Sequence, residues 1–229
     1  MIGSARGENV TELVVFDLDG TLVDSRLDIV HAVCCSLQAL GVMACSEQAI
    51  TGRIGVPLVA IFEEFLPPGK RHLVERAISI YREVYLAHCT DQTVLYAGVL
   101  EGLDRLSGIS LAIATTKKTH SAIELVRRMG LIERFALVQG TEEPPYKPHP
   151  AVLHAVLHKL GHQPENCWMV GDTVYDIQAG RAAGMRTCAV TYGYASLAEL
   201  AREKPDRLVD SLAELPGGLD GDPGALRGR

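Results

Sequence analysis

The sequence predicts an α/β protein, a doubly wound parallel-sheet core into which a helical domain is inserted. Three observations lead to this fold class. Short, almost continuously apolar runs recur along the chain, which is typical of parallel strands covered on both faces. Stretches with helical spacing separate these runs, as in sheets whose strands are joined by helices. One long stretch, residues 27–96, breaks this alternation and contains only helical patterns.

The composition restricts the class of protein. A chain of 229 residues that is 47% hydrophobic can bury a sizeable core. A net charge of -6 argues against nucleic acid as a partner, because binding its backbone needs a basic face. No apolar run approaches the roughly 20 residues that span a bilayer. The six cysteines form no C-x-x-C pair and no signal peptide is evident, so we expect a cytoplasmic, non-membrane protein with reduced thiols. The oligomeric state, monomer or homodimer, stays open.

Five apolar runs are expected to form the sheet: residues 13–16, 111–114, 135–138, 168–170 and 187–190. Three helices are expected between or after them. Residues 121–130 and 151–161 each end at a glycine, a common residue at the C-terminus of a helix. Residues 176–184 form a shorter helical stretch.

The inserted stretch contains two predicted helices. The first places Ile29, Val33, Leu37 and Leu40 on one face, and the second does the same with Leu73, Ala77, Ile80 and Val84, with Tyr85 as a further candidate. We therefore expect an α/β core formed by residues 1–26 and 97–216 and a helical cap formed by residues 27–96. Residues 217–229, rich in Gly, Asp and Pro, are expected to be a disordered tail.

Polar residues follow the ends of several predicted strands. In open α/β sheets, functional groups gather outside the carboxyl ends of the strands. The residues at these positions are Asp17, Asp19, Thr115, Thr116, Lys147, Asp172 and Asp176. They lie far apart in the sequence, but the predicted topology brings them to one edge of the sheet.

Such a cluster of carboxylates needs a cation. At ~4 Å and an effective dielectric constant of ~20, each pair of like charges costs roughly 4 kcal/mol. Lys147 alone cannot balance four acidic side chains. Oxygen ligands favour Mg²⁺, so Asp17, Asp19, Asp172 and Asp176 are the predicted metal residues.

The motifs resemble those of the haloacid dehalogenase superfamily of phosphatases. Residues 17–25, Asp-Leu-Asp-Gly-Thr-Leu-Val-Asp-Ser, are similar to the first motif of that superfamily. Thr115 matches the second motif, Lys147-Pro148 the third, and Gly171-Asp172-Thr173-Val174-Tyr175-Asp176 the fourth. The resemblance covers about residues 12–212 and is strongest to phosphoglycolate phosphatases, which carry a helical cap between the first two motifs.

This resemblance implies a role for each residue. Asp17 would attack phosphorus and become an aspartyl-phosphate. Asp19 would protonate the leaving alcohol and then activate water, and its main-chain carbonyl, with Asp17 and Asp172, would bind Mg²⁺. Asp176 would support the metal site or orient Lys147. Thr115 and Lys147 would hold the phosphoryl oxygens. Thr116 is a candidate for contacting the substrate, at a position where relatives often carry Asn.

The resemblance leaves several alternatives open. The leading hypothesis is hydrolysis of a small phosphorylated metabolite, with phosphoglycolate first. Transfer to a sugar, as in β-phosphoglucomutase, and pyrophosphatase or nucleotidase activity would use the same site. A non-catalytic interaction protein is a further alternative. Arg53, in a predicted cap loop, is either a ligand for a substrate carboxylate or a surface residue. Asp172 and Asp176 could also cap a helix.

Overall fold

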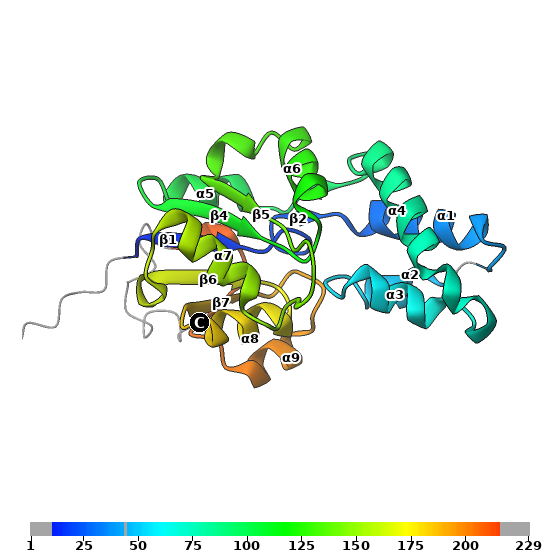
Figure 1. Ribbon diagram of the computed structural model, residues 1–229. Helices are drawn as coiled ribbons and strands as arrows, with labels where there is room; N and C mark the ends of the chain where they lie inside the picture. Colours follow the sequence, from blue (N-terminus) through cyan, green and yellow to red (C-terminus); the bar gives the residue numbers. More distant parts are fainter. Residues whose placement is uncertain (1–10, 44, 216–229) are drawn as a thin grey trace, which may run out of the picture.

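The computed structural model describes residues 11–43 and 45–215 and shows a parallel sheet with a helical cap beside it (Figure 1). The sheet order is β5-β4-β1-β6-β7-β8, and all neighbouring strands pair in parallel. Its strands are β1 (Leu13–Phe16), β4 (Ser110–Ala114), β5 (Leu137–Gln139), β6 (Cys167–Gly171), β7 (Arg186–Val190) and β8 (Arg207–Val209). The predicted fold class is confirmed.

Helices cover both faces of the sheet, as its apolar strands require. Side chains of β1 alternate between the faces: Val14 and Phe16 pack in one cluster, while Leu13 and Val15 pack in another. The first cluster contains residues of α5 (Val99–Arg105) and α6 (Thr119–Arg128), and the second contains residues of α7 (Ala151–Leu160) and α8 (Val174–Ala182). Helix α9 (Leu197–Glu203) follows β7, and short 3-10 turns complete the core at η2 (Ile132–Arg134), η3 (Pro164–Asn166) and η4 (Leu212–Glu214).

The structure confirms the five predicted strands and three predicted helices, with small shifts at their ends. The strand expected at residues 135–138 begins at Leu137, because Phe135 follows the turn η2 directly. Helix α8 begins at Val174, two residues before the predicted start. Strand β8 was missed, since only Val209 of its three residues is buried. The predicted disordered tail, residues 217–229, lies outside the described residues.

The cap consists of α1 (Arg26–Ala39), α2 (Glu47–Thr51), α3 (Leu58–Phe65), η1 (Pro68–Leu73) and α4 (Val74–His88). Its two longest helices, α1 and α4, are the two predicted ones and pack against each other. The inner face of α4 differs from the predicted stripe. Ala77 and Tyr85 are buried as expected, but Ile78 and Tyr81 accompany them, whereas Ile80 and Val84 are only half-buried.

The two chain segments that join cap and core are paired with each other. Strands β2 (Val23–Asp24) and β3 (Val94–Leu95) form a short antiparallel ladder. Just beyond it, the buried carboxylate of Asp28 accepts hydrogen bonds from the main-chain N–H groups of Gln92 and Thr93 and from the Thr93 hydroxyl. The start of α1 is thereby tied to the segment that returns to the core. The boundaries of the two proposed domains stay a prediction.

No helix within residues 11–43 and 45–215 combines the length and the hydropathy that crossing a membrane would need.

Replacing Asp28 by Asn tests this connection. The amide keeps the shape but turns one acceptor oxygen into a donor that faces other donors. We expect a loss of about 2 kcal/mol in unfolding free energy and a melting temperature lower by roughly 4–8 °C, measured by thermal denaturation. Asp91→Asn is the matched control, because Asp91 lies in the same region but its side chain is 59% exposed. Equal melting temperatures for the two variants would show that Asp28 does not secure the connection.

Candidate active site

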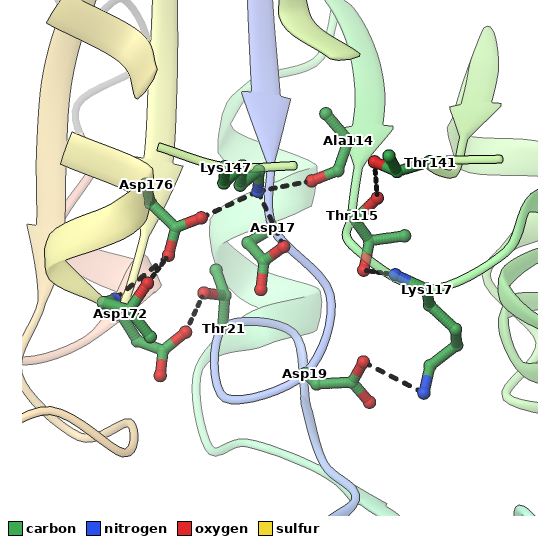
Figure 2. A network of polar contacts seen from close by, with 11 residues as sticks. Asp17, Asp19, Thr21, Ala114, Thr115, Lys117, Thr141, Lys147, Asp172 and Asp176 are labelled. Atoms are coloured by element: carbon green, nitrogen blue, oxygen red, sulfur yellow. Dashed lines mark hydrogen bonds and ion pairs between the residues drawn. The ribbon is translucent and has the colours of Figure 1, made fainter. Parts of the chain in front are cut away.

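Asp17 and Lys147 meet at the centre of the carboxyl edge of the sheet (Figure 2). Asp17 directly follows β1, and its N–H donates to the carbonyl of Val170 in β6 at 2.8 Å. The ammonium of Lys147 is buried and donates at 2.8 Å to Oδ1 of Asp17, at 2.7 Å to Oδ1 of Asp176 and at 2.7 Å to the carbonyl of Ala114. These three hydrogen bonds use all three N–H groups of the lysine, so its position is fixed.

Asp172 and Asp176 come from the turn between β6 and α8. Asp172 is fully buried and accepts hydrogen bonds from the Thr21 hydroxyl at 2.9 Å and from the N–H of Tyr194 at 2.9 Å. Oδ2 of Asp176 accepts from the N–H and hydroxyl of Thr173, which forms a capping box at the start of α8. Asp176 therefore takes part in capping the helix and also contacts Lys147. Its role at the metal site stays a prediction.

Three buried carboxylates form a group that suits a metal ion. Asp17, Asp172 and Asp176 each offer an oxygen, and these oxygens lie within 4.8 Å of one another. With all three ionised, one lysine leaves two negative charges uncompensated. At this distance and an effective dielectric constant of ~20, each repulsive pair costs roughly 3–4 kcal/mol. A set of oxygen ligands with this charge fits a hard divalent cation such as Mg²⁺.

The pKa values of these carboxyl groups and of Lys147 reflect the same excess of negative charge. Burial, opposed by Lys147 and reinforced by Asp176, raises the pKa of Asp17 to about 7. Burial and the neighbouring charges of Asp176 and Asp17 raise the pKa of Asp172 well above its ordinary range. Burial lowers the pKa of Lys147, but the attraction of Asp17 and Asp176 outweighs it and keeps the lysine charged.

The Asp19 side chain lies apart from the three clustered carboxylates. Its Oδ1 accepts a hydrogen bond from the Ser25 hydroxyl at 2.5 Å, and its Oδ2 lies 3.2 Å from Nζ of Lys117. Among the described residues, the group that could hold a metal does not include the Asp19 carboxylate. The role of its main-chain carbonyl in metal binding stays a prediction.

Lys117 is a site residue that sequence reasoning missed. Besides contacting Asp19, its ammonium lies 4.2 Å from the ring centroid of Tyr85, a residue of cap helix α4. Lys117 thus contacts both the core and the cap. Its position just after Thr115 and Thr116, at the end of β4, was the available signal.

The remaining predicted residues lie around this centre. Thr115 is buried at the end of β4, and its hydroxyl accepts from the N–H of Lys117 at 3.2 Å. Thr116 lines a hollow between cap and core that also contains Asp19. Arg53 is exposed and pairs with Glu64, its Nη2 lying 2.9 Å from one carboxylate oxygen and 2.8 Å from the other. Arg53 lines a different hollow, beside Thr173.

Two glycines allow the backbone to approach the carboxylates. Gly20 has φ +91°, and a Cβ there would lie 2.2 Å from Oδ2 of Asp172. A Cβ on Gly171 would lie 2.3 Å from Cβ of Asp176. Neither position has room for a side chain, so the close packing of the cluster depends on both glycines.

Comparisons with known proteins match this chain over most of its length. Residues 14–190 match the family model described as haloacid dehalogenase-like hydrolase. The chain is 36% identical over 211 residues to a protein of Dickeya dadantii named "Probable phosphatase IndB", covering 90% of this chain and 92% of the relative. It is 35% identical over 211 residues to the phosphoglycolate phosphatase of Chromobacterium violaceum, covering 88% and 93% of the two chains.

A solved structure has the same fold over nearly its whole length. The haloacid dehalogenase-like family protein from Streptococcus pneumoniae superposes with a TM-score of 0.82 at 31% identity, covering 90% of this chain and 97% of that one. The family model, the relatives and the shared fold show that this chain belongs to the haloacid dehalogenase-like hydrolases and is an enzyme of the phosphatase type.

Proposed function

We propose that the protein is a Mg²⁺-dependent phosphomonoesterase that hydrolyses a small phosphorylated metabolite through an aspartyl-phosphate on Asp17. The observation that carries this proposal is the buried group of Asp17, Asp172 and Asp176 around Lys147. In this group, the carboxylate proposed as the nucleophile lies beside the buried ammonium of Lys147 and beside two further carboxylates that could bind a metal ion. This arrangement suits attack on an anionic phosphorus centre.

The side chains of Asp17 and Asp172, together with the carbonyl of Asp19, would hold the Mg²⁺, and Asp176 would support it. A bound Mg²⁺ would neutralise charge on the phosphoryl oxygens and on the attacking carboxylate. Lys147 contributes a second positive charge to the same place. Because Lys147 is held by Asp17, Asp176 and the carbonyl of Ala114, it offers this charge without reorganising.

In the first half of the reaction, a carboxylate oxygen of Asp17 forms a bond to phosphorus and the bond from phosphorus to the ester oxygen breaks. Asp19 donates a proton to the departing oxygen, so an alcohol leaves. The hydrogen bond from Ser25 and the contact with Lys117 hold the Asp19 carboxyl in place. The hydroxyl of Thr115, at the end of β4, would hold a phosphoryl oxygen.

In the second half, Asp19 accepts a proton from a water molecule that attacks the phosphorus. The bond between phosphorus and the Asp17 oxygen breaks, which releases inorganic phosphate and regenerates the Asp17 carboxylate. Asp19 therefore returns to its protonated form for the next cycle. One residue performs both proton transfers because the alcohol leaves, and the water enters, on the same side of phosphorus.

Phosphoglycolate is the leading candidate substrate. Support comes from the relative of Chromobacterium violaceum, which is named phosphoglycolate phosphatase and matches nearly the whole chain. We further propose that the enzyme acts in the cytoplasm. The six cysteines are free thiols, as expected for a reducing compartment.

Asp17→Asn tests the nucleophile. The amide has a similar shape but cannot attack phosphorus, so we expect kcat to fall by roughly 10⁴-fold or more. The measurement is release of inorganic phosphate from phosphoglycolate and from p-nitrophenyl phosphate. Asp206→Asn, a change at the far end of the sheet where Asp206 binds Thr187, is the control and should keep its activity. Full turnover by Asp17→Asn would refute the mechanism.

Asp19→Asn separates the two proton transfers. For phosphoglycolate, whose alcohol leaves poorly, we expect a decrease of about 10²–10⁴-fold in kcat. p-Nitrophenolate leaves without a proton, so the variant should release a rapid burst of one equivalent and then stall at hydrolysis. Stopped-flow absorbance measures this burst. Equal rate losses for both esters, without a burst, would contradict the assigned role.

Removal of the metal tests the cation site. Treatment with EDTA should abolish phosphate release, and added Mg²⁺ should restore it. The ion should also raise the melting temperature of the wild-type protein, because binding to the folded state alone stabilises that state. In Asp172→Asn we expect no such rise. Activity that survives complete chelation would rule out the cation.

A further inference from the structure

A hollow between the cap and the core lies beside Asp19, and we call it the cap hollow. Its volume is about 90 Å³. This is several times the roughly 10–15 Å³ that a cavity needs to hold a single water molecule. Asp19 contributes to its wall from the core side. Since Asp19 is the proposed proton donor to the leaving alcohol, the cap hollow is where the rest of that alcohol would lie.

The cap side of this hollow is mainly apolar. Ile54 and Val56 line it from the turn after α2, Leu58 and Ile61 from α3, and Ile78 from α4. A methylene group placed in an apolar pocket improves kcat/KM by roughly tenfold or more. A bare two-carbon alcohol would leave much of this surface without contact.

Two aromatic residues line the same wall. Tyr81 and Tyr85 line the hollow, and their rings stack with centroids 5.5 Å apart and an interplanar angle of 9°. Both residues are buried. The ring of Tyr85 also contacts Lys117, so this wall is fixed to the residue that holds Asp19.

Three cations line the cap hollow, and two of them already have acidic partners. Lys117 contacts Asp19 at 3.2 Å, and Lys118 lies 3.7 Å from Glu142 and 3.9 Å from Glu143. Arg82, on the exposed side of α4, makes no hydrogen bond or ion pair with any residue of the described part of the chain. It is thus a cation available to an anionic group on a ligand.

Arg53, which the sequence suggested as a ligand for a substrate carboxylate, is placed less well for that role than Arg82. It pairs with Glu64 and does not line the cap hollow. Within the described part of the chain, the cation that lines the cap hollow together with Asp19 and has no acidic partner is instead Arg82, on cap helix α4.

We propose that the substrate is the phosphate ester of a short hydroxy acid with an apolar body, and that Arg82 selects it by binding the carboxylate. The inference rests on the proposed phosphatase function and narrows its substrate class. Phosphoglycolate is the smallest member of this class, and esters with an alkyl group on the hydroxy acid fill the cap hollow better.

Four esters test the two parts of the proposal. They are the phosphate esters of glycolate and of 2-hydroxy-4-methylpentanoate, each as the free acid and as the uncharged amide. For the wild-type protein, we expect the larger acid to exceed phosphoglycolate in kcat/KM by about tenfold or more. In Arg82→Gln, the preference for each acid over its amide should fall by about tenfold or more, since a charge-assisted hydrogen bond is lost.

Arg76→Gln is the matched control, because Arg76 is an exposed arginine of the same helix that does not line the cap hollow. This variant should keep the wild-type preference. An unchanged preference in Arg82→Gln, or no gain from the larger acid, would overturn the inference. Hydrolysis of p-nitrophenyl phosphate distinguishes a failure of this inference from a failure of the proposed phosphatase function. If this ester is hydrolysed while either expectation fails, only the inference is wrong. If no ester is hydrolysed, the proposed function fails with it.

Discussion

Three carboxylates are buried together at one edge of a parallel sheet, and their mutual repulsion is the main physical constraint on the site of this enzyme. Asp17, Asp172 and Asp176 lie close enough that one lysine cannot balance their charge. The fold holds them together because the carboxyl ends of β1 and β6 are neighbours. Hydrogen bonds from Thr21 and Tyr194 stabilise Asp172, and a hydrogen bond from Thr173 stabilises Asp176. The excess negative charge that remains suits a divalent cation, and such a cation would in turn attract an anionic phosphoryl group.

The cap is connected to this centre by its own interactions. Its two linking segments pair in a small ladder, and Asp28 ties the start of α1 to the returning segment. On the inner side, Tyr85 of the cap lies against Lys117, which contacts Asp19. The proposed acid and base of the reaction is therefore held by a lysine that the cap also contacts. The proposed substrate selection in the cap hollow and the proposed proton transfer at Asp19 would therefore depend on the same part of the structure, where Tyr85 contacts Lys117.

Most of the fold could be predicted from the sequence, because strands buried on both faces leave continuous apolar runs. Strand β8 escaped notice since a single buried residue gives no such pattern. The clustering of Asp17, Asp172, Asp176 and Lys147 followed from the rule that strand ends share an edge. Lys117 was missed because its importance comes from Tyr85, which is distant in sequence. The inner face of α4 was misplaced because aliphatic periodicity favoured Ile80 and Val84, whereas the structure buries Ile78 and Tyr81.

A single crystallographic measurement tests the account most directly. Mn²⁺ takes oxygen ligands much as Mg²⁺ does and can be located by its anomalous scattering. In crystals soaked with Mn²⁺, the account predicts one strong anomalous peak, which marks an ion bound by the carboxylates of Asp17 and Asp172 and close to Asp176. A peak elsewhere on the protein, or an ordered site that binds no ion at millimolar Mn²⁺, would contradict the claim that these carboxylates converge to hold a cation.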